Sequence, residues 1–127
     1  MQIKMNEILN FATFYGVVRN QKLGIKTAYK LNRLARAIDV EVKFYQEKFQ
    51  EILNEYSEKD ENGQFIYINN SEQIKLREGM SQTCYAAVND LQQLEVELPN
   101  TKFSIDEFAN IELTVDDIGY AMPFIED

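Results

Sequence analysis

Apolar residues between positions 27 and 56 recur at alternating steps of four and three, and this segment contains neither Gly nor Pro. Such heptad spacing aligns side chains along one face of a helix. Thr27 is an acceptable N-cap, and Gly24 marks a break before it. The pattern predicts one long helix from 27 to 56, with an apolar seam made of Leu31, Ala35, Ile38, Val42, Tyr45, Phe49, Ile52 and Tyr56.

Two shorter helical patterns flank the long one. Residues 3–18 and residues 71–92 carry apolar side chains at helical spacing, and Asn70 and Gln73 fit the N-cap and the capping-box position of the second segment. Because this second seam matches that of the long helix, the two are expected to pack as an antiparallel hairpin. The expected inner faces are Met5, Ile8, Leu9, Ala12, Tyr15 and Val18, and then Leu76, Met80, Cys84, Ala87, Leu91 and Leu94.

Short stretches between and after the helices have the character of β-strands. Residues 60–63 contain an Asn-Gly pair and predict a turn, which the aromatic and β-branched run 64–68 follows. Residues 94–98 alternate between apolar and acidic side chains, as in a half-buried strand. We expect these two runs to form a small β element, with 111–113 as a further candidate strand.

The C-terminal segment carries two helix-start patterns. Ser104-x-x-Glu107 is a capping box, Thr114-x-x-Asp117 resembles one, and Pro123 is expected to end or kink the last helix. The whole pattern predicts a mainly α (α+β) fold in a single domain, 1–127. It comprises an N-terminal helix, a long antiparallel helical hairpin and a small β element.

The chain has one cysteine and no histidine. Histidine is the side chain best suited to proton transfer near neutral pH, and its absence excludes Ser-His-Asp and Cys-His nucleophiles. Cys84 falls on an apolar seam, where an inert core thiol is the expected role. We therefore expect no enzyme activity, no catalytic residue and no cofactor.

Carboxylate pairs are the remaining candidates for a metal site. Asp60-Glu61 and Asp116-Asp117 offer oxygen ligands of the kind that Mg²⁺ and Ca²⁺ prefer. A turn accounts for the first pair, and the favourable dipole at a helix N-terminus accounts for the second. The structural interpretation is favoured for both pairs, so no metal site is predicted.

The sequence also bears on the compartment. No stretch approaches the roughly 18 apolar residues that span a bilayer, and the N-terminus lacks the regions of a signal peptide. A single cysteine forms no intrachain disulfide. We expect a cytoplasmic protein without a membrane partner.

Charge is divided unevenly along the chain. Residues 1–40 hold seven cations and two carboxylates, a net charge of +5, whereas the rest holds six cations and nineteen carboxylates, a net charge of −13. From Asp90 onward, ten carboxylates accompany the single cation Lys102. Such separation favours a charged partner or self-association.

Two candidate binding surfaces follow from this division. The acidic face comprises Glu95, Glu97, Asp106, Glu107, Glu112, Asp116 and Asp117. The second choice, the basic stripe, comprises Lys22, Lys26, Lys30 and Arg33. Either set also fits a solvated surface kept for solubility, and a third interpretation places the acidic segment against the stripe, within one chain or between copies. The net acidity argues against direct nucleic-acid binding.

Several segments have a familiar layout: Met-x-Ile-Lys-Met-x-Glu-Ile-Leu at the start, Lys-x-x-Tyr-Lys-Leu-Asn-Arg at 26–33, Lys-Asp-Glu-Asn-Gly at 59–63, and Ile-Glu-Leu-Thr at 111–114. In this layout the chain resembles small, uncharacterised proteins encoded by phages and prophages of Gram-positive bacteria. The resemblance implies a phage context and brings no catalytic residue with it.

The expected function is protein binding without catalysis. In the phage context, the leading hypothesis is an anti-CRISPR-like inhibitor of a bacterial defence nuclease or its complex, acting through the acidic face on a host complex that binds nucleic acid. The alternative is a virion or tail assembly factor that forms homo-oligomers through its heptad face or through opposite charges.

Overall fold

The computed structural model describes residues 1–69 and 71–126. The chain divides into two compact units: unit 1 consists of Met1–Phe44 and Gln93–Asp127, and unit 2 of Tyr45–Gln92. The helix α2 (Ile25–Tyr56) contributes residues to both units. The single domain expected for 1–127 stays a prediction.

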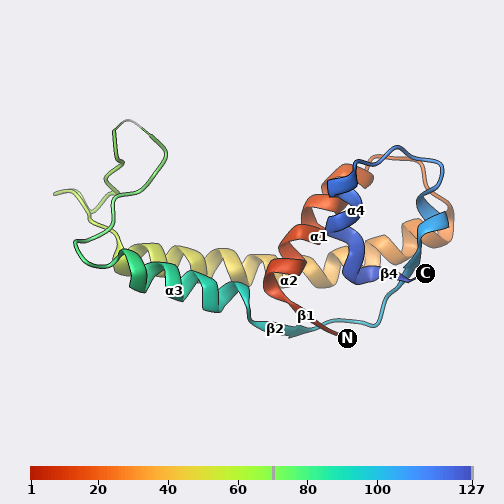
Figure 1. Ribbon diagram of the computed structural model, residues 1–127, viewed down its shortest axis with the longest axis horizontal. Coiled ribbons are helices and arrows are strands. Elements are labelled where there is room, and N and C mark those ends of the chain that lie inside the picture. The colour runs from red at the N-terminus through yellow and green to blue at the C-terminus, as the bar shows by residue number, and fades with distance from the viewer. Residues whose placement is uncertain (70, 127) are drawn as a thin grey trace. The chain divides into compact units, whose positions relative to one another are not determined.

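The predicted mainly α fold with a minor β component is confirmed (Figure 1). The helices are α1 (Met5–Val18), α2 (Ile25–Tyr56), α3 (Ser81–Gln92) and α4 (Val115–Ala121), with 3-10 turns η1 (Ile105–Phe108) and η2 (Met122–Phe124). The strands are β1 (Gln2–Lys4), β2 (Glu95–Glu97), β3 (Phe103–Ser104) and β4 (Ile125–Glu126).

Aromatic side chains form the centre of unit 1, where α1 packs beside α4 (Figure 1). Phe11 and Phe14 are fully buried, and the ring of Phe11 lies 4.5 Å from that of Phe124. The predicted face of α1, with Leu9, Ala12 and Tyr15, is therefore wrong in part. Apolar side chains surround much of this helix, so packing against the C-terminal segment decides which of them are buried.

The alternation at 94–98 is confirmed as a strand, but its expected partner is wrong. β2 pairs antiparallel with β1, so that Ile3 lies opposite Val96, and both side chains are buried. The run 64–68 lies in unit 2 and takes no part in this sheet. β3 and β4 form a parallel pair, and the candidate strand at 111–113 is irregular chain.

The long helix is confirmed, with a different start. α2 begins at Ile25, where the Gly24 carbonyl accepts the first helical hydrogen bond, from the Ala28 N–H at 2.9 Å. Thr27 is thus a buried residue of the first turn and not the N-cap. The seam is buried at Leu31, Leu34 and Ile38. It is only half-buried at Val42, Tyr45, Phe49, Ile52 and Tyr56.

The third helix is shorter than predicted. α3 begins at Ser81, and Gly79, at φ 77°, interrupts the chain just before it. Residues 71–80 instead form isolated bridges, among them Ser57 with Leu76 and Tyr67 with Ile74. These bridges form hydrogen bonds with backbone N–H and C=O groups that would have paired with one another in the predicted helix. The predicted N-cap Asn70 lies outside the described residues.

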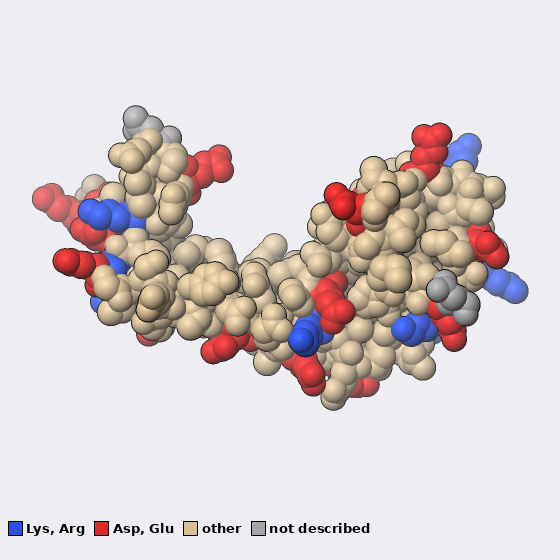
Figure 2. Space-filling model, in the orientation of Figure 1, with Lys and Arg blue, Asp and Glu red and all other residues tan. Residues whose placement is uncertain are grey.

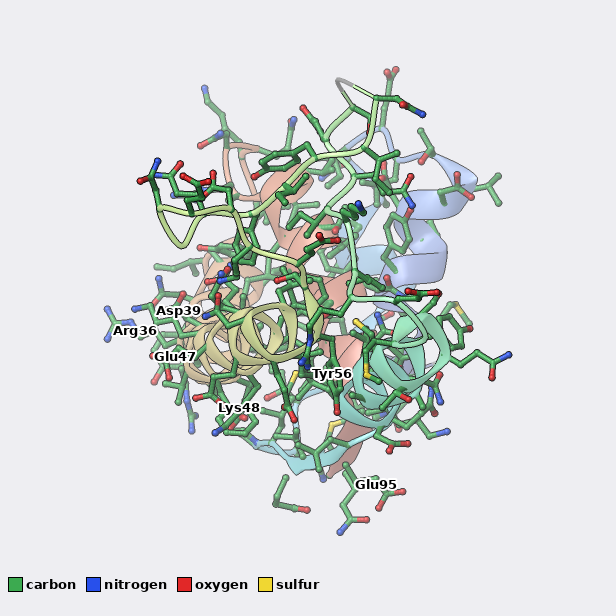
Figure 3. The ribbon with its side chains drawn as sticks, turned by 90° about the vertical axis from the view of Figure 1, so that its left-hand side faces the viewer. Arg36, Asp39, Glu47, Lys48, Tyr56 and Glu95 are labelled. Atoms are coloured by element: carbon green, nitrogen blue, oxygen red, sulfur yellow. The ribbon has the colours of Figure 1, made fainter. Side chains whose placement is uncertain are left out.

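Unit 2 nevertheless contains the antiparallel hairpin, formed by α3 and the end of α2 (Figure 1). Tyr56 lies between the two helices, whereas Glu47 and Lys48 point away from α3 (Figure 3). The predicted turn at 60–63 is confirmed, because Asp60 Oδ1 accepts from the N–H groups of Asn62 at 2.8 Å and Gln64 at 3.0 Å. Gly63 adopts φ 76°, a value that glycine accepts without steric cost.

Candidate protein-binding surface

Two capping boxes hold the acidic C-terminal segment of unit 1 in place, as the sequence predicted. Glu107 Oε2 accepts from the Ser104 N–H at 2.7 Å, and Ser104 Oγ accepts from the Asp106 N–H at 3.3 Å. At α4, Thr114 and Asp117 exchange two hydrogen bonds of 3.0 Å. Local hydrogen bonds therefore fix the N-terminal ends of η1 and α4, and with them the backbone that carries the neighbouring carboxylates.

Glu107 joins this segment to the first turns of α2. Its carboxylate accepts from the Thr27 hydroxyl at 2.8 Å and from Lys30 Nζ at 2.9 Å. Lys30 also donates to the Lys102 carbonyl at 2.9 Å and lies 4.6 Å from the centre of the Phe103 ring. Glu107 and Lys30, one from each predicted surface, thus meet in an internal contact that stabilises unit 1.

The pKa of Glu107 is lowered from its ordinary value. Burial acts in the opposite direction and is the largest single influence. It is outweighed by the hydrogen bonds from Lys30, the Ser104 N–H and Thr27 together with the charge of Lys30. Because these donors favour the ionised form, the carboxylate is held as an anion.

Two other members of the predicted acidic face, Glu97 and Asp117, also have side-chain partners. Glu95 lies opposite Lys4 in the β1–β2 pair, and its side chain points outward from β2 (Figure 3). Glu97 forms an ion pair of 3.0 Å with the Met1 amine. Asp117 caps α4. Asp106, Glu112 and Asp116 are exposed, as are Glu95 and Glu97, whereas Glu107 and Asp117 are half-buried.

An apolar depression lies between η1 and α4, and we call it the acidic groove. Asp106 belongs to its lining, and Glu112 is the neighbour in the chain of the lining residues Ile111 and Leu113. The groove has a volume of about 300 Å³, and it opens to solvent. Residues 103–127 contain no Lys or Arg, so the groove's own segment supplies only negative charge. The groove is lined by Ile105, Asp106, Phe108, Ala109, Ile111, Leu113 and Ile118.

The apolar residues of the acidic groove were missed in the sequence. The sequence predicts a candidate strand at 111–113, which includes Ile111 and Leu113. The two helix-start patterns give Ile105 and Ile118 no role in a surface. The sequence signal that could have identified these lining residues is an aliphatic residue placed next to each carboxylate in this segment. An isolated period-two run of three residues does not distinguish a strand from a loop that lines a groove.

A second pocket, of about 610 Å³, lies on the other side of η1 and is lined by Ile25, Lys26, Tyr29, Lys30, Ser104 and Glu107. We call it the basic pocket. Ile25 is 86% exposed and Tyr29 is 63% exposed. Of the predicted basic stripe, Lys22, Lys26 and Arg33 are exposed, whereas Lys30 is half-buried in its contact with Glu107.

Positive and negative side chains are interspersed on the face of the molecule drawn in Figure 2. On this face neither unit presents a broad area of one sign. The charge division along the chain therefore translates into small neighbouring clusters on this face rather than into one extended acidic face.

Unit 2 contains an apolar groove of its own, of about 480 Å³. Phe49 and Leu53 of α2 lie across it from Cys84 and Val88 of α3. Cys84 is buried, as expected for a core thiol. The other lining residues are Glu72, Ile74, Leu76, Ser81 and Tyr85.

The two carboxylate pairs considered for metal binding have structural roles at Asp60, in the turn, and at Asp117, in the cap. Within residues 1–69 and 71–126, no group of three or more Cys, Asp or Glu side chains is arranged to hold a metal ion. In the same described part of the chain, no helix has both the length and the apolar character needed to cross a bilayer.

Comparison of this chain with protein-family models, with curated proteins and with solved structures finds no match.

Proposed function

We propose that this chain is a non-catalytic protein-binding protein whose acidic groove receives a basic, amphipathic segment of a partner. The observation that carries the proposal is the combination of an apolar floor with carboxylates at its edge. Ile105 is 42% exposed at this site, Asp106 lies in the same lining, and the carboxylates of Asp106 and Glu112 are exposed.

An apolar floor and a charged rim are what protein interfaces need. Apolar contact supplies most of the affinity, and complementary charge orients the partner and speeds its approach. A segment with aliphatic residues on one side and Lys or Arg on the other would satisfy both features of the groove. An amphipathic helix has this arrangement in its simplest form.

The phage resemblance supplies the biological context for this proposal. Proteins that hold nucleic acid present basic surfaces, which an acidic groove complements. An inhibitor of a bacterial defence nuclease or its complex therefore remains the leading version of the function. A virion or tail assembly factor is the alternative, and the exposed Ile25 and Tyr29 of the basic pocket favour it as a further contact surface.

Equilibrium binding of a synthetic helical peptide tests the proposal. A fluorescent peptide with a Leu face and a Lys face should bind, and the matched Leu/Glu peptide should not. The double variant Asp106→Lys with Glu112→Lys should weaken binding by about tenfold or more, because it reverses the rim charge. Ile105→Ser should also weaken binding, although it leaves the charge unchanged.

The matched control is Glu61→Lys with Glu78→Lys. Both residues are exposed in unit 2, and the control changes the net charge by the same amount as the groove variant. Equal losses of peptide affinity in the two double variants would show that bulk charge, and not the groove, governs binding. That result would refute the proposal.

A further inference from the structure

The two most exposed large apolar side chains in the described part of the chain are Val115, at 89%, and Ile25, at 86%. Each is the first residue of a helix, Val115 of α4 and Ile25 of α2. Exposed apolar side chains mark an interaction site where they lie together in a patch. Ile25 meets this condition, because it lines the basic pocket together with the exposed Tyr29.

The charges beside these two residues are opposite in sign. Ile25 is followed by Lys26 and preceded by Lys22, and all three are exposed. Val115 is followed by Asp116 and Asp117 and lies near Glu112 in the chain. An exposed apolar side chain thus lies among cations at the start of α2. Val115 lies among carboxylates at the start of α4, although Val115 itself is not part of the lining of the acidic groove.

The 3-10 turn η1 separates the basic pocket from the acidic groove. Its Glu107 and its N-cap Ser104 line the basic pocket, whereas Ile105, Asp106 and Phe108 line the acidic groove. Both surfaces belong to unit 1 and lie on either side of the same short element. A second copy turned by a two-fold rotation near η1 would place each basic surface against the partner's acidic one.

We infer that a second copy of this chain occupies the acidic groove, through the basic apolar surface formed by Lys22, Ile25, Lys26 and Tyr29, in a two-fold symmetric dimer. This inference rests on the proposed function, because it names an occupant of the same groove. The single interface of such a dimer contains two equivalent charged contacts, related by the two-fold axis. A foreign basic segment must then displace the second copy in order to bind.

Charge complementarity selects a second copy as the occupant. The amphipathic basic segment that the groove requires is present in the chain itself, as exposed Ile25 and Tyr29 spaced one helical turn apart with Lys22 and Lys26 beside them. A stable dimer buries roughly 1,200–2,000 Å² in total, so the contact must extend over η1 and both neighbouring surfaces.

The experiment measures molar mass by sedimentation equilibrium over a range of protein concentrations and salt concentrations. The wild-type chain should reach the mass of a dimer and no more, and high salt should dissociate it. A wild-type chain that is monomeric at every concentration overturns the inference. So does continued growth beyond a dimer, because an open head-to-tail contact would then replace the symmetric one.

Two charge reversals give the sharper test. Lys22→Glu with Lys26→Glu makes both surfaces acidic, and Asp106→Lys with Glu112→Lys makes both basic. Each variant alone should be monomeric, because like charges then face each other. An equimolar mixture should dimerise, because both contacts of the mixed dimer pair opposite charges. A mixture that stays monomeric, or a variant that dimerises alone, overturns the inference.

These charge reversals should leave the fold intact, because Lys22 and Lys26 are exposed. Lys26→Glu also falls in the first turn of α2, where the helix dipole favours a negative charge. The same variants separate this inference from the proposed function. Lys22→Glu with Lys26→Glu should still bind the Leu/Lys peptide, since its groove is intact. A wild-type chain that binds the Leu/Lys peptide but never dimerises overturns only the inference, whereas a Lys22→Glu, Lys26→Glu chain that fails to bind the peptide contradicts the proposed function.

Discussion

Glu107 shows how a single carboxylate can belong to a charged region of the sequence and yet serve the interior of the fold. It was assigned both to a capping box and to the acidic face. The structure supports the first assignment directly and adds the contacts to Thr27 and Lys30. The capping box is a local pattern and is visible in the sequence, whereas the pairing with α2 joins residues about eighty positions apart and is not.

Replacing Glu107 with Gln should destabilise unit 1 by about 1–3 kcal/mol at neutral pH, because charge-assisted hydrogen bonds are lost. The pKa of Glu107 is lowered in the folded state. Its stabilising contribution is therefore present above the pKa of the unfolded chain and is lost as the pH falls through the folded pKa. The difference in unfolding free energy between wild type and variant should shrink on acidification.

Urea denaturation at a series of pH values measures this difference. Glu112→Gln is the matched control, since Glu112 is exposed and should change stability little. A wild-type advantage that stays constant into strong acid would contradict the role given to the ionised carboxylate.

Burial separates two phenylalanines that look equivalent in the sequence. Phe14 is fully buried in unit 1, whereas Phe49 is half-buried in unit 2, where it stacks on Tyr45 at 5.8 Å. Phe14→Ala should cost about 3–5 kcal/mol, and Phe49→Ala should cost less, about 1–2 kcal/mol. Urea denaturation of both variants checks the order, and an equal or reversed order would refute the assignment of the core.

At the level of elements, the C-terminal caps, the turn and the helical hairpin were predicted, whereas the pairing of β2 and the full buried face of α1 were not. The cap patterns at Ser104 and Thr114 and the turn at 60–63 depend on neighbouring residues, and all were predicted. The partner of β2 and the buried face of α1 depend on contacts between distant segments. The predicted helix at 71–80 failed because apolar spacing there suits bridged, extended chain as well, and Gly79 ends the irregular segment.

The cap of α4 gives a test at this scale. Thr114→Ala removes the oxygen that accepts the Asp117 N–H, so it should cost about 1 kcal/mol. Thr83→Ala, at an exposed position within α3, is the control and should be close to neutral or slightly stabilising. If the two substitutions change the unfolding free energy equally, the capping interaction does not stabilise α4.

At the scale of the whole molecule, the two units differ in how much apolar surface they bury. In the described part of the chain, every buried apolar side chain except Cys84 belongs to unit 1. We expect amide hydrogen exchange to be slowest in α1 and in the first turns of α2, and faster in residues 57–80. Stronger protection in residues 57–80 than in α1 would contradict this distribution of stability.

The charge division along the sequence singled out the C-terminal third and the start of α2, but it did not reveal the acidic groove. The groove depends on how η1 turns toward α4, which only the folded chain defines. Glu97, Glu107 and Asp117 have side-chain partners within unit 1, so the charged rim of the acidic groove is narrower than the predicted acidic face.

The most direct test of the central claim is the rate at which the Leu/Lys peptide associates with the Lys22→Glu, Lys26→Glu chain, in which the groove should be free of a second copy. Stopped-flow fluorescence measures this rate across a salt series that passes the point where the Debye length is about 8 Å. If carboxylates line the rim of the groove, the association rate should fall steeply as the salt concentration rises. Adding Asp106→Lys and Glu112→Lys should make association much slower and its rate much less dependent on salt. A rate that is insensitive to salt, or that these two groove substitutions leave unchanged, would contradict the account.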